Sequence, residues 1–241
     1  MKLSHKIRKL ADPATIVSAK RRIRRALQPL PVSRFMAQID EKELKRLQQA
    51  YGVPGTTQWP KYVEAERFLR MNIRRVQDIG LDRLPPQHIL DLGSGAGYFL
   101  FVNKVLGHTG LGIDVDNVPL YRETFQLFGL RRVIHRIDKF KPLPDTGAQY
   151  DWITAFSISF DSPAKYGPWG VAEWDYFLQD ARRHLRPGGR IYLDLNPRND
   201  GSFYSPELRE FFLRQGATID RRSKLLFPPK RYGATAGRAE F

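Results

Sequence analysis

The residues best placed to do chemistry form a glycine-rich turn from Asp91 to Gly97. The turn reads Asp-Leu-Gly-Ser-Gly-Ala-Gly, with glycines at 93, 95 and 97 and Ser94 between the first two. A turn of this kind between a strand and a helix brings the backbone close to a nucleotide-like ligand. Dinucleotide sites use the spacing G-x-G-x-x-G, whereas residue 98 is Tyr here, and the lysine of a phosphate-binding P-loop is absent.

The first residue of the turn is an acid, Asp91, and its charge favours some ligands over others. A carboxylate at this point would repel a phosphate group, and it would attract the ammonium of a methionine moiety, directly or through water. The charge therefore disfavours both a nicotinamide dinucleotide and a nucleoside triphosphate.

The segments before and after this turn alternate between predicted strands and predicted helices. The hydrophobic patterns predict strands at 88–92, 111–114, 132–137, 150–156 and 190–195, and a final strand or hairpin in 217–227. They predict helices at 37–50, 61–79, 99–106, 118–128, 171–185 and 206–214. The alternation predicts an α/β fold: a mostly parallel, doubly wound, Rossmann-like sheet with helices on both faces, preceded by a helical N-terminal extension.

Residues Ile89 to Tyr98 resemble motif I of the class I S-adenosylmethionine-dependent methyltransferases, and the resemblance extends in order to about Leu195. It implies that S-adenosylmethionine is the cofactor and that Asp114 takes both ribose hydroxyls, with Val115 against the adenine. It also implies that Asp138, after Ile137, accepts a hydrogen bond from the adenine amino group. The expected cofactor-binding residues are Asp91, Gly93, Ser94, Gly95, Gly97, Asp114, Val115, Ile137, Asp138 and Phe156.

Simpler structural roles exist for several of these residues. The glycines could be structural punctuation, Asp114 could cap the following helix, and Asp138 could be a surface acid. In domain terms we expect a basic helical extension or cap over 1–60, a class I methyltransferase domain over 61–228, and a disordered tail over 229–241.

Methyl transfer from a sulfonium needs alignment of a nucleophile and exclusion of water, and it requires no metal. Asp161 is the candidate catalytic base, on the loop after the fourth strand, although it could equally be a solvated loop acid. Tyr166, Trp169 and Trp174 could line an acceptor pocket or anchor a lid on the core. The expected acceptor is a small molecule, a glycan or a lipid-linked compound.

The chain has a net charge of +15, but the positive residues are concentrated at its two ends, which disfavours a nucleic-acid partner. Residues 1–36 hold ten Lys and Arg against one acid and residues 221–241 hold six against one, so residues 37–220 are almost neutral. A neutral central domain does not suit an enzyme that tracks a phosphate backbone. An RNA or protein methyltransferase with basic terminal arms, and a non-catalytic cofactor-fold protein, remain the alternatives.

Residues 14–30 have the pattern of a basic amphipathic helix, with Ile16, Ile23 and Leu27 on one face. Such a helix could make weak contact with an anionic membrane or pack its apolar edge on the catalytic domain. The 241 residues contain no cysteine and no apolar stretch long enough to span a bilayer. We expect a cytoplasmic protein, with this helix as the segment that would place it at the periphery of a membrane.

Overall fold

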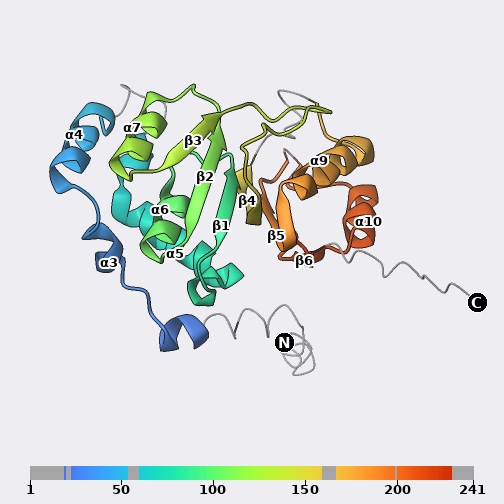
Figure 1. The fold of residues 1–241 in the computed structure, drawn as a ribbon, viewed down its shortest axis with the longest axis horizontal. Helices are drawn as coiled ribbons and strands as arrows, with labels where there is room; N and C mark the ends of the chain where they lie inside the picture. Colours follow the sequence, from blue (N-terminus) through green and yellow to red (C-terminus); the bar gives the residue numbers. More distant parts are fainter. Residues whose placement is uncertain (1–18, 20–22, 54–59, 159–166, 199, 230–241) are drawn as a thin grey trace, which may run out of the picture.

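The computed structural model describes residues 19, 23–53, 60–158, 167–198 and 200–229, and the fold is an α/β sandwich around one seven-stranded sheet (Figure 1). The sheet order is β3-β2-β1-β4-β5-β7-β6. Its strands are β1 (His88–Leu92), β2 (Thr109–Asp114), β3 (Arg131–Ile134), β4 (Tyr150–Ile158), β5 (Leu185–Leu195), β6 (Thr218–Asp220) and β7 (Lys224–Phe227). The first five are mutually parallel, and β7 runs antiparallel to both β5 and β6. This arrangement confirms the predicted fold class.

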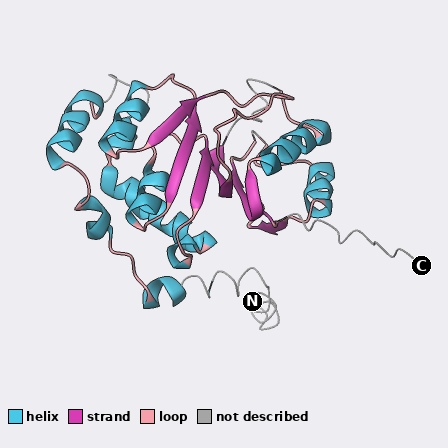
Figure 2. Cartoon of the chain, viewed as in Figure 1, coloured by secondary structure: helices cyan, strands magenta, loops and turns pink. Residues whose placement is uncertain are grey.

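Helices cover both faces of the sheet (Figure 2). They are α3 (Val32–Met36), α4 (Glu41–Tyr51), α5 (Ala65–Ile79), α6 (Tyr98–Val105), α7 (Pro119–Leu127), α9 (Val171–Arg183) and α10 (Pro206–Arg214), with 3-10 turns η1 (Pro60–Val63) and η2 (Leu81–Arg83). Successive strand residues point to opposite faces, so Ile89 packs with α5 and α6 while Leu90 packs with α9 and α10. Two separate hydrophobic clusters result, one on each face.

Several strand boundaries differ from the sequence-based prediction, and in the two largest differences the pairing of neighbouring strands decides the boundary. β3 stops at Ile134 instead of reaching residue 137, since its neighbour β2 ends at Asp114, the partner of Ile134. β5 begins at Leu185 instead of residue 190, because Leu185 pairs with Tyr150 at the start of β4. The predicted C-terminal hairpin is confirmed as β6 and β7.

The order of the strands reverses between β1 and β4, because the chain adds β2 and β3 on one side of β1 and then returns to the other side. Asp91 of β1 lies next to Thr154 of β4 in the parallel register. In open α/β sheets, ligands bind in the crevice beyond the carboxyl ends of the strands at such a switch point. The glycine-rich turn leaves β1 at that place.

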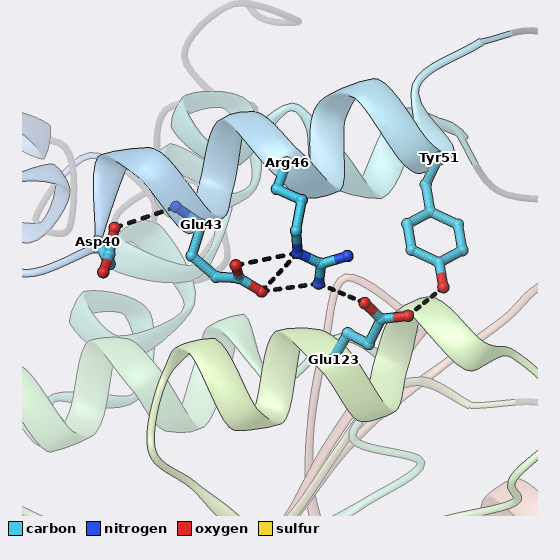
Figure 3. Close-up of polar contacts among 5 residues, drawn as sticks. All are labelled: Asp40, Glu43, Arg46, Tyr51 and Glu123. Atoms are coloured by element: carbon cyan, nitrogen blue, oxygen red, sulfur yellow. Dashed lines mark hydrogen bonds and ion pairs between the residues drawn. The ribbon is translucent and has the colours of Figure 1, made fainter.

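The N-terminal helices α3 and α4 belong to the same core as the helices that cover the sheet. Phe35 of α3 is fully buried in the cluster that contains α5 and α6, and Leu47 of α4 packs with Leu120 of α7. A polar clasp also joins α4 to α7 (Figure 3). Glu123 of α7 accepts hydrogen bonds from Arg46, at 2.5 Å, and from the Tyr51 hydroxyl.

The predicted helix at 14–30 lies largely outside the described residues. In the part that is described, Ile23 and Leu27 are 59% and 76% exposed, so no part of the described structure covers these two apolar side chains. Arg25 forms an ion pair of 2.8 Å with Asp78 at the end of α5. Among the described helices, none is both long enough and apolar enough to cross a membrane.

Candidate functional site

A cleft of about 580 Å³ lies beyond the carboxyl ends of β1, β2 and β4, at the switch point of the sheet. The glycine-rich turn forms one part of its surface, and η1 and α5 close it from the side. Of the residues that the sequence predicts to bind the cofactor, those brought together here are Asp91, Gly93, Ser94, Gly95, Gly97, Asp114, Val115 and Phe156.

All three glycines of the turn have positive φ angles: 64° at Gly93, 53° at Gly95 and 75° at Gly97. A Cβ at Gly97 would lie 2.7 Å from the ring of Phe125, so both the backbone conformation and the packing at this position require glycine. Gly97 therefore has a structural role in forming the turn. Gly93 and Gly95 leave more room, and both line the cleft.

Four N–H groups of the turn, those of Gly93, Ser94, Gly95 and Gly97, already have acceptors inside the protein. Gly93 and Ser94 donate to the Ile113 carbonyl at 2.8 and 3.2 Å, Gly95 donates to Asp114, and Gly97 donates to the Ser94 carbonyl. A phosphate-binding turn instead points such donors at its ligand. These four donors are therefore not available to a pyrophosphate.

Asp91 lies at the base of the cleft and is only 3% exposed. Burial raises the pKa of its carboxyl to about 7, even though the Thr154 hydroxyl donates to it at 2.7 Å and the Arg75 charge also favours ionisation. A carboxyl desolvated to this degree is stabilised in its charged form by any cation that enters the cleft. A cationic ligand group is therefore favoured at this end.

Asp114, the last residue of β2, holds the glycine-rich turn in place. Its carboxylate accepts the Gly95 N–H at 2.6 Å and the Val115 N–H at 2.7 Å, one on each oxygen. It does not cap the next helix, because the N-cap of α7 is Val118. Burial raises the pKa of Asp114, and the two N–H groups act in the opposite direction. Each oxygen keeps a lone pair for a further donor, such as a hydroxyl of a vicinal diol.

Aromatic rings close the end of the cleft near Val115. Tyr62 of η1 lies 4.7 Å from the Phe68 ring and 5.3 Å, edge to face, from the Tyr121 ring. The Tyr98 hydroxyl donates to the Tyr62 carbonyl at 2.8 Å, which ties η1 to α6. These rings give the cleft an apolar slot that suits a flat heteroaromatic ring.

Sequence reasoning missed Arg75 of α5, which lines the cleft. Its guanidinium lies 4.7 Å from the centroid of the Phe156 ring and donates to Ser157 Oγ at 3.0 Å and to Asn72 Oδ1 at 3.1 Å. The signal that could have found it is the inward face of α5, where Phe68, Asn72 and Arg75 recur at helical spacing. A charged side chain among the inward-facing residues of an amphipathic helix is unusual.

Other predicted site residues lie elsewhere. Ile137 packs against the core, and Asp138 forms ion pairs with Lys141 at 3.3 Å and Arg136 at 3.7 Å; neither lines the cleft, and the adenine contact of Asp138 stays a prediction. Asp161 and Tyr166 fall outside the described residues.

Two tryptophans are core residues. The sequence left open whether they line an acceptor pocket or anchor a lid on the core. Trp169 and Trp174 are 2% and 0% exposed, and their rings pack edge to face at 5.3 Å. This arrangement matches the anchor interpretation. The described part of the chain contains no cluster of His, Asp or Glu that could hold a metal ion.

No protein-family model matches the sequence, and no curated protein matches it significantly. Similar solved structures include the S-adenosylmethionine-bound amino pentose methyltransferase CalS10 from Micromonospora echinaspora, at 22% identity over 56% of this chain and 55% of that chain, with a TM-score of 0.41. An O-methyltransferase family protein from Burkholderia thailandensis is 14% identical over 91% of this chain and 72% of that chain, with a TM-score of 0.44. The glycopeptide N-methyltransferase MtfA, complexed with S-adenosylmethionine, is 16% identical over 49% of this chain and 52% of that chain, with a TM-score of 0.39.

The chain thus spans about half the length of CalS10 and of MtfA. Identities and TM-scores at this level are too low to say anything about the activity of this chain. Its fold and cleft define a Rossmann-like α/β protein whose cleft lies at the topological switch point.

Proposed function

We propose that this chain is an S-adenosylmethionine-dependent methyltransferase. The observation that supports this most strongly is the pairing of a buried acid, Asp91, with a glycine-rich turn in which four N–H groups are already bonded within the protein. Such a cleft favours a nucleoside that carries a positive charge over one that carries phosphates. S-Adenosylmethionine is a nucleoside of this kind, because it has a sulfonium and an ammonium and no phosphate.

The residues present fit each part of this cofactor. Asp114 keeps two free lone pairs at the end of β2, where they suit the ribose hydroxyls. Val115 and the rings of Tyr62 and Tyr121 provide the apolar slot for the adenine.

When bound, the cofactor supplies an activated methyl group whose transfer leaves a neutral thioether. The chain itself has three tasks: to fix the cofactor, to align the acceptor with the methyl carbon, and to exclude water. The tip of β4, at Phe156 and Ile158, gives the cleft an apolar border that suits the last of these tasks. In this proposal Asp161, on the segment after β4, acts as the general base.

The proposed acceptor is a small molecule, a glycan or a lipid-linked compound. If Asp161 is the base, Asp161→Asn lowers turnover on that acceptor and leaves cofactor affinity unchanged. A nucleic-acid acceptor would instead bind through the basic termini, with an affinity that falls steeply as salt is raised.

Titration calorimetry of the purified protein with S-adenosylmethionine, and in parallel with NAD, tests the proposal without knowledge of the acceptor. Micromolar binding of S-adenosylmethionine alone would support it and justify a screen for acceptors. Binding of NAD alone would point to hydride transfer, and binding of neither ligand would leave a cofactor-fold protein with another role.

A further inference from the structure

The cleft contains a cation, Arg75, that no acid among the described residues neutralises at close range. The two hydrogen bonds of Arg75 go to uncharged groups, the Ser157 hydroxyl and the Asn72 amide oxygen, and the third contact is the Phe156 ring. None of the ion pairs within the described ranges involves Arg75. The exposed arginines earlier on α5 differ, because Arg67 pairs with Glu64 at 3.1 Å and Arg70 pairs with Glu66.

This cation is also desolvated. Burial lowers the pKa of Arg75, and the acids that act against that shift, Asp194 and Asp91, do so from beyond ion-pair distance. A charge taken out of water without a close counter-ion costs free energy, which an anionic ligand group would recover. The planar guanidinium fork suits a carboxylate, which it can bind through two parallel hydrogen bonds.

Arg75 and Asp91 line the same cleft and present opposite charges to it. An α-amino acid group carries an ammonium and a carboxylate one carbon atom apart, so a positive and a negative protein group in one cleft complement it. We propose that Arg75 forms the carboxylate subsite of this cleft and binds the methionine carboxylate of the cofactor while Asp91 takes the ammonium. This inference rests on the proposed function.

A purely structural role for Arg75 makes a different prediction. Ser157 has a φ of 55° and lies where the pairing of β4 with β5 is irregular, and Asn196 also holds it through the Ser157 carbonyl at 2.8 Å. If Arg75 only supported this strained residue, its loss would affect every ligand of the cleft equally. If it binds a carboxylate, its loss affects only ligands that have one.

The test is calorimetric titration with two ligands, S-adenosylmethionine and decarboxylated S-adenosylmethionine, which lacks only the carboxylate. The proteins are the wild type, Arg75→Met and the control Arg74→Met, an exposed neighbour on the same helix that has no ion pair among the described residues. We expect Arg75→Met to bind S-adenosylmethionine about 10- to 100-fold more weakly, the range for a lost charged hydrogen bond, and to bind the decarboxylated ligand as the wild type does. Arg74→Met should match the wild type with both ligands.

Each other outcome is decisive. Equal losses for both ligands in Arg75→Met would make Arg75 a support for Ser157, and no loss would remove it from the site; both overturn the subsite and leave the proposed function standing. If the wild type binds neither ligand, the proposed function fails together with the subsite. If Arg75→Met does not fold, the wild type alone decides, because equal affinity for the two ligands would exclude a carboxylate subsite.

Discussion

The carboxylate of Asp114 accepts the N–H of Gly95 at 2.6 Å, so the last residue of β2 fixes the turn that follows β1. The same carboxylate faces the cleft, where the proposed cofactor presents its ribose. Under the proposed function, one side chain therefore shapes the turn and also binds the ligand. Removing this carboxylate should therefore change both the ligand affinity and the stability of the fold.

Asp114→Ala should weaken S-adenosylmethionine binding by about 1 to 3 kcal/mol, the range for lost hydrogen bonds to a charged group. It should also lower the free energy of unfolding, because the N–H groups of Gly95 and Val115 lose their acceptors. Calorimetry and urea unfolding measure the two effects. Glu210→Ala is the control, since Glu210 is exposed on α10, lies outside the cleft and has only a 3.9 Å pair with Arg214; unchanged cofactor affinity in Asp114→Ala would refute the ribose assignment.

The pKa of Asp91, raised by burial to about 7, makes cofactor affinity depend on pH. Protonation removes the charge that attracts the ammonium, so affinity should fall several-fold from about pH 7.5 to about pH 6 if only the ionised form binds well. Asp91→Asn should bind the cofactor weakly and lose this dependence. A wild-type affinity that stays constant over this range would contradict the assignment of the ammonium to Asp91.

The same shift predicts how the ligand-free protein responds to pH. Because the pKa of Asp91 is higher in the folded state than its ordinary value of 3.8, its contribution to stability is complete below that value and is lost as the pH rises through 7. Asp91→Asn removes this loss and still offers an oxygen to the Thr154 hydroxyl. Above pH 7 the variant should therefore melt at a higher temperature than the wild type, which thermal unfolding at several pH values would establish.

Gly97→Ala should destabilise the fold strongly, because it combines a φ of 75° with a clash of 2.7 Å against Phe125. We expect a loss of about 2 to 4 kcal/mol, of which backbone strain accounts for about 1 kcal/mol and overpacking for the remainder. Gly107→Ala isolates the strain, since Gly107 has a φ of 93° and nothing within 4 Å of the added Cβ. Equal losses in urea unfolding would show that Phe125 moves aside without cost.

The clasp between α4 and α7 should contribute modestly to stability (Figure 3). Glu123→Ala removes the acceptor of the Tyr51 hydroxyl and one of the two acceptors of Arg46, which keeps Glu43. We expect a loss of about 1 kcal/mol that shrinks as salt is added. Glu41→Ala is the control, because its pair with Lys45 is almost fully solvated and should contribute little. A loss in Glu123→Ala that does not change with salt would mean that packing, and not charge, joins the helices.

Short-range patterns in the sequence were sufficient for the strand, turn and helix around the glycines. The apolar run before Asp91 and the glycines after it can form only a few local structures, and β1 lies where the pattern predicts it. The place of Asp114 at the end of the second strand could be predicted for the same reason, whereas its ribose role came from the resemblance to the methyltransferase motifs. These predictions depend on neighbours along the chain, which a sequence displays directly.

Tertiary packing decided the features that depend on distant segments. Whether the third strand reached residue 137 depended on its partner β2, and the burial that raises the pKa of Asp91 depended on β4 and α5. Arg75 became part of the cleft only because α5 packs across α6 and brings its guanidinium to the Phe156 ring. A charge on a helix face has no assigned neighbour until the helix packs, so the amino-acid sequence alone determined the turn and its acids, and the three-dimensional structure determined which charge lies opposite them.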